Sequence, residues 1–179
     1  MPKYVALLRA INVGGHTVKM DYLRSLFEAI DFTNVETFIA SGNVIFDAKS
    51  GSSKAMERRI EIQLQETLGY EVKTFLRSIS ELAAVAAYKP FSDSELNKEG
   101  HALYIGFVAD NPGDEAKQKL PSYCGEIDEL HVQGREIYWL CRTKMGDSKF
   151  SGAVAEKILG MRATFRNSTT VRRMAAKYL

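Results

Sequence analysis

The feature that most constrains the fold is a succession of strand and helix signals that runs through the first half of the chain and then starts again. Apolar runs without helical spacing predict strands in the first half at residues 4–10, 35–40, 44–46 and 72–76. Apolar residues at helical spacing predict helices at residues 21–30, 54–68 and 78–88. The first half therefore has the order β-α-β-β-α-β-α.

The same order begins again after a polar stretch at residues 92–100. Strands are predicted at residues 102–109, 128–132, 136–141 and 163–165. Helices are predicted from residue 112 to 120, from 148 to 159 and from 168 onwards. Their ends are marked by expected N-caps at Asp21 and Ser148, a capping box of Ser78 with Glu81, and closing glycines at Gly69 and Gly160.

The two halves align with similar spacing, and the β-α-β-β-α-β order is that of the split, ferredoxin-like unit. The matched positions are Tyr4 with Ala102, Gly42 with Gly134, and Thr74 with Thr164. We therefore predict an α+β protein of two tandem split units, a first subdomain at residues 1–90 and a second at 101–179. Because several strands are apolar on both faces, we expect the units to bury each other's open faces or to share a sheet in one compact protein.

Length and composition exclude several classes of protein. With 179 residues, 45% of them hydrophobic and 26% charged, the chain can bury an ordinary globular core without a disulfide or metal. No apolar stretch approaches the roughly 20 residues of a membrane helix, and the start of the chain lacks a secretory pattern. We therefore expect a cytoplasmic protein with reduced thiols at Cys124 and Cys141 and no membrane partner.

The net charge of +2 is distributed unevenly. From residue 142 to the last residue, nine lysines and arginines are opposed by only two acidic residues, Asp147 and Glu156. Such asymmetry is typical either of a surface for phosphate or nucleic acid or of a solvated helix face. The sequence leaves both interpretations open.

A first polar cluster is expected where two neighbouring strands end. The first two strands of a split unit run in the same direction, so the loop after the first strand should lie near the loop after the second. The residues concerned are Arg9, Asn12, Gly14, Gly15, Ser41, Gly42 and Asn43. Arginine, hydroxyl and amide donors beside flexible glycines could hold a carboxylate or phosphate. Alternatively, the glycines only make turns and the arginine pairs with a carboxylate.

A second polar cluster is expected at two helix starts, residues 147–150 and residues 166–170, with Ser148, Lys149, Arg166 and Asn167 as its candidate site residues. A helix N-terminus offers free N–H groups, and a nearby cation completes an anion site. Ordinary capping beside exposed charge is the alternative. Whether this cluster meets the first one depends on packing that the sequence does not determine.

No motif assigns a catalytic residue, a cofactor or a metal. His16, His101 and His131 lack metal-ligand spacing, and the nucleotide-binding glycine patterns are absent, so we expect neither metal nor cofactor. Residues 103–106 fit the first-strand signature of RNA-recognition motifs, but residues 136–140 lack the glycines and basic residue of its partner. Tyr104 and Trp139 are therefore expected in the core. The sequence does not decide whether the protein is an enzyme.

Four motifs together carry a family resemblance: residues 7–15, 38–46, 148–150 and 164–167. In order and spacing, the chain resembles the bacterial domain-of-unknown-function family 1697. The resemblance implies a bacterial cytoplasmic protein with a two-subdomain α+β fold, and it implies no activity. The recurring polar positions of the family correspond to Arg9, Asn12, Gly14, Gly15, Ser41, Gly42, Asn43, Ser148, Lys149, Arg166 and Asn167. The chain departs from the family at Ser168, where members often have tryptophan, and at Ala40, where they often have glutamine.

Three functional hypotheses follow. The first is binding of a small anionic ligand, such as a phosphorylated metabolite or nucleotide, with charge from Arg9, Lys149 and Arg166 and orientation from Asn12, Ser41, Asn43 and Asn167. The second is nucleic-acid binding through the basic C-terminal face. The third is an interaction module without a ligand. The oligomeric state is not predicted.

Overall fold

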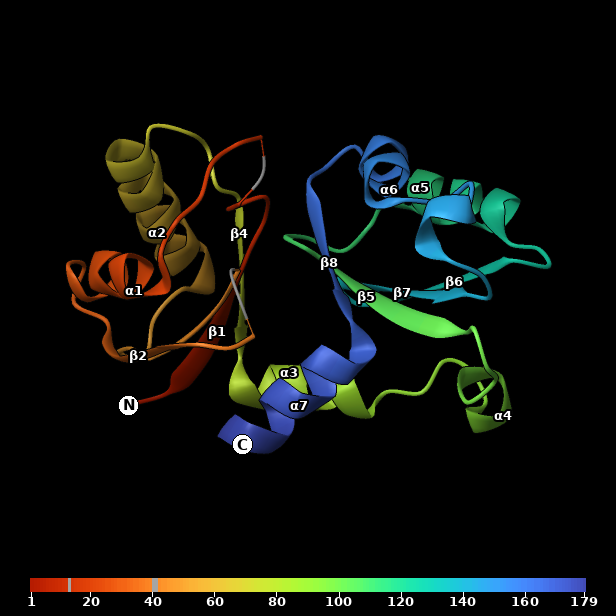
Figure 1. Ribbon diagram of the computed structural model, residues 1–179, viewed down its shortest axis with the longest axis horizontal. Coiled ribbons are helices and arrows are strands. Elements are labelled where there is room, and N and C mark those ends of the chain that lie inside the picture. Colours follow the sequence, from red (N-terminus) through yellow and green to blue (C-terminus); the bar gives the residue numbers. More distant parts are fainter. Residues whose placement is uncertain (13, 40–41) are drawn as a thin grey trace. The chain divides into compact units, whose positions relative to one another are not determined.

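The computed structural model describes residues 1–12, 14–39 and 42–179, and these divide into two units (Figure 1). Unit 1 comprises Met1–Ala84 and Met174–Leu179, and unit 2 comprises Val85–Arg173. The divisions fall within two helices, α3 (Ile79–Ala87) and α7 (Ser168–Tyr178). Each unit is an antiparallel sheet with helices.

The sheet of unit 1 contains β1 (Lys3–Leu8), β2 (Thr33–Thr37), β3 (Asn43–Asp47) and β4 (Thr74–Ser78). Its order is β2-β3-β1-β4, with every neighbouring pair antiparallel. The helices α1 (Met20–Glu28) and α2 (Ser53–Leu68) cover one face of this sheet (Figure 1). On that face Tyr4, Ala6 and Leu8 pack with Phe27 of α1 and Ile60 of α2.

Unit 2 repeats this architecture with the order β6-β7-β5-β8. Its strands are β5 (Ala102–Val108), β6 (Asp128–Gln133), β7 (Glu136–Cys141) and β8 (Ala163–Asn167). Its helices are α4 (Asp93–Leu96), α5 (Asp114–Lys119) and α6 (Gly152–Leu159), with short 3-10 turns η1 (Leu120–Tyr123) and η2 (Met145–Asp147). Figure 1 shows α5 and α6 over one face of the sheet, where Trp139, Phe150 and Leu159 form the core. The expected core position of Trp139 is confirmed, since it is 1% exposed.

The α+β fold of two similar units is thus confirmed, and all predicted strands occur with their ends displaced by a few residues. Of the two expected arrangements, the shared sheet is excluded, because the strands form two separate sheets. The strand β1, which is apolar on both faces, is buried on both faces. Val5 and Leu7 lie on the face that α1 and α2 do not cover, and neither residue has exposed surface. The helix α4 was not predicted in the polar stretch that contains it.

Hydrogen bonding aligns the two sheets more accurately than the sequence does. In unit 1 the Leu8 N–H donates to the Gly42 carbonyl at 2.8 Å, and in unit 2 the Val108 N–H donates to the Arg135 carbonyl at 3.1 Å. The three sequence matches are wrong by one or two positions: Tyr4 corresponds to Tyr104 rather than Ala102, Gly42 to Arg135 rather than Gly134, and Thr74 to Ala163 rather than Thr164. Residue identity between the halves is slight, so the sequence alone could not fix the strand register.

The predicted helix ends are confirmed in part. Ser78 and Glu81 form the expected capping box, with bonds of 2.7 Å from the Ser78 N–H to the carboxylate and 3.1 Å from the Glu81 N–H to the hydroxyl. Gly69 and Gly160 end their helices with φ of 86° and 66°. No helix in the described ranges is both long and apolar enough to cross a membrane.

Two predicted N-caps are wrong. Asp21 lies inside the first turn of α1, which begins at Met20. Ser148 follows the 3-10 turn η2, and α6 begins only at Gly152, capped by the Ser151 hydroxyl, which accepts from the Val154 N–H at 3.2 Å. Ser148 does not cap α6 because its hydroxyl is bound elsewhere, to the carboxylate of Asp128.

In each unit a glutamate shields the free edge of the last strand. Glu57 of α2 is 4% exposed, and its carboxylate accepts from the Leu76 N–H of β4 at 2.9 Å. In unit 2, Glu156 of α6 accepts from the Ala163 N–H of β8 at 3.3 Å. These carboxylates satisfy edge N–H groups that would otherwise be open to another strand.

Candidate ligand pocket of unit 2

The first predicted cluster lies in unit 1 at the end of β1. Gly42, with φ of 101°, accepts from Leu8, which places it beside the residue that precedes Arg9. The Arg9 N–H donates to the Lys73 carbonyl at 2.9 Å. The structure therefore brings the first loop and Gly42 to the same end of the sheet, while Ser41 lies outside the described residues.

Two asparagines of this cluster support the backbone. The Asn12 side-chain oxygen accepts from the Val18 N–H at 2.8 Å and closes the loop that contains Gly14 and Gly15, at φ of 62° and 83°. Asn43 is 3% exposed, and its amide donates to the Phe38 carbonyl at 3.0 Å. These bonds account for the presence of both asparagines without a ligand.

Ser148 of the second cluster belongs to a buried network. Its hydroxyl lies 2.7 and 2.8 Å from the two carboxylate oxygens of Asp128 and accepts from the Phe150 N–H at 2.9 Å. The Trp139 indole N–H donates to the same carboxylate at 2.8 Å. Ser148 therefore helps to hold β6 against the core, and Lys149 beside it is exposed.

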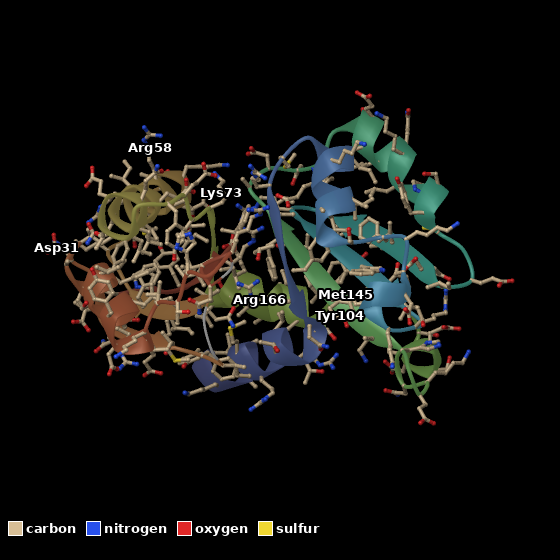
Figure 2. All side chains as sticks on the ribbon, turned by 45° about the horizontal axis from the view of Figure 1, so that its top comes forward. Asp31, Arg58, Lys73, Tyr104, Met145 and Arg166 are labelled. Atoms are coloured by element: carbon tan, nitrogen blue, oxygen red, sulfur yellow. The ribbon has the colours of Figure 1, made fainter. Side chains whose placement is uncertain are left out.

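Arg166 and Asn167 lie on β8, at the opposite edge of the sheet from β6. The structure therefore does not bring them together with Ser148 and Lys149. Figure 2 labels Arg166 and Tyr104, on the neighbouring strands β8 and β5. The Arg166 guanidinium donates to the Thr164 hydroxyl at 2.7 Å and to the Phe165 carbonyl at 3.0 Å. Desolvation lowers the pKa of Arg166 to about 10, so it stays charged at neutral pH.

Asn167 lines a pocket of about 350 Å³ at the N-terminus of α7, here named the α7 pocket. Its walls come from the end of α3, the segment around α4, the first half of β5 and the first turns of α7. The lining residues are Ala86, Tyr88, Lys89, Asp93, Leu96, Asn97, His101, Ala102, Leu103, Ile105, Asn167, Ser168, Thr169 and Arg172. Asn167 is the only predicted site residue among them.

The first residue of α7 gives this pocket its most informative group. Ser168 is only 6% exposed, and throughout the described ranges its hydroxyl makes no hydrogen bond. Beside it, the Asn167 side-chain oxygen accepts from the Thr169 N–H at 2.9 Å. No buried side-chain oxygen or nitrogen of the described residues lacks a partner, so this hydroxyl faces the pocket and is available to a ligand atom.

Charged groups also line the pocket. Arg172 is exposed, with its guanidinium 3.5 Å from the Thr169 hydroxyl, and Lys89 pairs with Asp93 at 3.2 Å. The first turn of α7 has no acidic residue. The positive end of the α7 dipole is therefore not neutralised by a carboxylate of its own first turn.

His101 occupies another part of the lining, with its side chain 12% exposed. Its Nδ1 lies 2.8 Å from the Glu95 carbonyl, which can only accept, so Nδ1 carries a proton and Nε2 offers a lone pair while the ring is neutral. Hydrogen bonds from Lys98 and then Arg142 lower the pKa of Glu95. It is the backbone carbonyl of Glu95, and not its carboxylate, that makes the 2.8 Å bond to His101.

Apolar and aromatic residues form another part of the lining, beside the polar Asn97. Leu103 and Ile105 of β5 are 8% and 2% exposed. The Tyr88 hydroxyl lies 2.7 Å from His131 Nε2, and its ring packs 5.2 Å from that of Tyr138. These contacts hold the aromatic wall in place.

A second cavity, of about 640 Å³, lies in unit 1 beside the N-terminus of α2. Two of its polar groups are engaged: the Ser52 hydroxyl accepts from the Ala55 N–H at 3.3 Å, and Arg59 donates to the Ile30 carbonyl while lying 5.1 Å from the centre of the Phe32 ring. Over the described part of the chain, no group of His, Cys, Asp and Glu is arranged to hold a metal ion. The α7 pocket is the stronger candidate site because its lining combines the N-terminus of α7 with Arg172 and the Ser168 hydroxyl, which is unpartnered among the described residues.

Sequence reasoning missed this pocket because most of its lining lies in or beside a stretch that was interpreted only as a polar linker. One signal could have found it. Ser92 and Glu95 have capping-box spacing, and the Ser92 hydroxyl does accept from the Glu95 N–H at 3.3 Å at the start of α4.

Comparisons with known proteins bear on the family and the fold. A family model with the description "Protein of unknown function (DUF1697)" matches residues 1–138. No curated protein matches the chain. The structure of conserved bacterial protein SP0830 from Streptococcus pneumoniae is similar, with a TM-score of 0.75 and 22% sequence identity over 98% of this chain and 97% of that one. At this identity the likeness shows the two-unit α+β fold alone. Because the model spans more than half of the sequence, this chain belongs to the family of proteins of unknown function DUF1697.

Proposed function

We propose that the protein binds a small anionic ligand in the α7 pocket, with the N-terminus of α7 and Arg172 facing the negative group. The observation that carries the proposal is the Ser168 hydroxyl, which lines the pocket and makes no hydrogen bond to the described residues. Because no buried side-chain oxygen or nitrogen of the described residues lacks a partner, this hydroxyl is open to the pocket. An oxygen of a bound anion would accept this hydrogen bond.

The electrostatics of the pocket support an anion over a cation. A helix N-terminus carries a partial positive charge, and anions are commonly bound there. Lys89 and Arg172 add two cations to the lining, against a single carboxylate from Asp93. A cationic ligand would be repelled by the N-terminus of α7, Lys89 and Arg172, and attracted only by Asp93.

The proposal keeps Asn167 from the predicted site and does not need the others. For them a ligand role remains a prediction: Arg9, Asn12, Gly14, Gly15, Ser41, Gly42, Asn43, Ser148, Lys149 and Arg166. Cys124 and Cys141 are both free thiols, which fits the expected cytoplasmic location, where phosphorylated metabolites occur.

Nucleic-acid binding through α7 is the competing proposal, and the exposed Arg172 and Arg173 favour it. Lys177, one turn further, pairs with Glu36 at 3.6 Å and lies 5.7 Å from the centre of the Phe38 ring. Its charge is thus partly countered. Binding that depends on backbone phosphates would weaken steeply with salt, whereas binding in a pocket would not.

The test is a thermal-shift series on the whole chain with inorganic phosphate, phosphorylated metabolites and short RNA and DNA, at low and high salt. A ligand at about a hundred times its dissociation constant should raise Tm by about 5–10 °C. Ser168→Ala should bind about tenfold more weakly without loss of stability, because it removes a hydroxyl that has no partner in the free protein.

Ser122→Ala, at an exposed serine of η1, is the matched control and should behave like the parent chain. Two results would overturn the proposal: no small anion shifts the parent chain, or Ser168→Ala responds like the parent. If no small anion changes Tm, but RNA or DNA raises it in a salt-sensitive way, the nucleic-acid proposal is favoured.

A further inference from the structure

We infer that the ligand of the α7 pocket is a phosphate monoester carrying a planar, hydrogen-bonding ring, in the manner of a nucleoside monophosphate, rather than an inorganic anion. This inference rests on the proposed anion site and concerns the other residues that line the pocket. Three features of the lining carry it: size, an apolar wall, and a second set of polar groups.

The pocket is too large for a simple anion. Its volume of about 350 Å³ lies at the lower end of the range of about 300–1,000 Å³ found for organic ligands. A water molecule takes about 30 Å³, so an inorganic phosphate would leave space for several waters. An ester with a ring-sized body would occupy that space.

The apolar and aromatic residues of the lining offer a surface against which a planar ring can pack. Leu103 and Ile105 of β5, together with Ala86 of α3, form apolar wall, and waters held against them would lack partners. Tyr88 adds an aromatic surface whose position is fixed by His131 and Tyr138. A planar ring can pack against such a wall at little conformational cost.

The ring should also carry hydrogen-bonding groups. His101 Nε2 makes no hydrogen bond to any described residue, while Nδ1 is held by the Glu95 carbonyl. Asn97 supplies an amide to the same pocket. An amino or hydroxyl group on the ligand would donate to His101, and Asn97 could pair with a ring carbonyl or amine. A nucleobase offers such groups on a planar frame, and a lipid phosphate does not.

The experiment measures dissociation constants of the whole chain by calorimetry for inorganic phosphate, glycerol phosphate, the four ribonucleoside 5′-monophosphates and the matching nucleosides. At least one monophosphate should bind ten- to a hundredfold more tightly than inorganic phosphate, glycerol phosphate and its own nucleoside. Ala86→Leu should weaken that monophosphate at least tenfold by filling the apolar side, with little effect on inorganic phosphate.

Ala87→Leu is the matched control, because the neighbouring alanine on α3 is exposed and absent from the lining. Ser168→Ala should weaken inorganic phosphate and monophosphate alike. Equal affinity for phosphate, glycerol phosphate and all monophosphates would overturn this inference and leave the anion site standing. Silence from every phosphate compound would overturn both, and so would nucleosides that bind as tightly as their monophosphates.

Discussion

The ring of Phe165 fills the space that a β-carbon on Gly106 would need. A β-carbon at Gly106 would lie 2.6 Å from Cε1 and 2.7 Å from Cζ of that ring, which is closer than carbon atoms can approach. The two residues are direct partners in the pairing of β5 with β8. From this position the ring centre of Phe165 lies 6.1 Å from that of Trp139 and 6.4 Å from that of Phe150.

Gly106→Ala should therefore lower the free energy of unfolding by about 1–3 kcal/mol, because the ring must leave a packed core. Trp139 is the only tryptophan, so its emission spectrum should change together with the midpoint of urea unfolding. Gly125→Ala is the control, since a β-carbon there meets no atom within 4 Å. Equal unfolding midpoints for the two variants would contradict the prediction.

A second substitution should relieve this clash. The corresponding pair in unit 1 is Ala6 opposite Leu76, so Gly106→Ala with Phe165→Leu copies an arrangement that the other sheet already uses. The double variant should lose less stability than the sum of its single variants, with a coupling free energy of at least about 0.5 kcal/mol. If the stability losses of the two single variants simply add, Gly106 is not required to make room for the Phe165 ring.

Glu57→Ala should lower the free energy of unfolding by about 1–3 kcal/mol, since it leaves the Leu76 N–H of an edge strand without its acceptor. Glu57→Gln keeps a side-chain oxygen and should lose less. Glu66→Ala, at an exposed position on the same helix, should change stability by less than about 0.5 kcal/mol. The three variants are compared by urea unfolding, and a Glu57→Ala variant as stable as Glu66→Ala would exclude an edge-shielding role.

Glu95 should give stability a defined pH dependence. Hydrogen bonds from Lys98 and then Arg142 lower its pKa in the folded state, so its contribution is present above the ordinary value of 4.5 and disappears as the pH falls through the lowered pKa. Glu95→Gln should thus be less stable than the parent chain at neutral pH and equally stable in acid. Urea unfolding between about pH 7 and pH 3 measures the difference, with the exposed Glu99→Gln as control.

Ser148→Ala should act on stability and not on ligand binding. It removes a hydrogen bond to a carboxylate that is 5% exposed, at a cost of about 1.5–3 kcal/mol. The emission of Trp139 should shift too, because its indole shares Asp128. The affinity for phosphate should stay unchanged, since Ser148 and the α7 pocket lie at opposite edges of the sheet. A variant of normal stability that no longer binds phosphate would instead support the ligand role expected from sequence.

Much of the fold could be predicted because local signals agreed with one another. Strand runs, helical spacing and the Ser78–Glu81 capping box all pointed to the split unit, and hydrogen bonds bear this out. The alignment of the two halves was wrong because it depends on strand register, and the two halves share too few identical residues to determine that register. The prediction of Ser148 as a cap failed because a buried carboxylate, distant in sequence, binds its hydroxyl more favourably than a helix end would.

The candidate site could be predicted only at Asn167. Arginines, glycines and asparagines in loops suggest ligand binding by residue type, but Asn12 and Asn43 have structural hydrogen bonds that no sequence pattern reveals. Ser168 was predicted at a helix start within the second polar cluster and as a departure from the family, but not as a site residue. Its burial and its free hydroxyl depend on the tertiary surroundings of α7, which local sequence does not encode.

The assignment of Met174–Leu179 to unit 1 has a consequence for biosynthesis. Tyr178 donates to the Glu36 carboxylate at 2.8 Å, so a strand made early on the ribosome acquires this contact only when the end of α7 has been translated. Unit 1 therefore lacks residues 174–179 until the whole of unit 2 has been synthesised. During that interval the surface of unit 1 that the end of α7 contacts stays accessible to chaperones and proteases. The time at which unit 1 is complete therefore depends on translation of the last residues and not on the order of its strands.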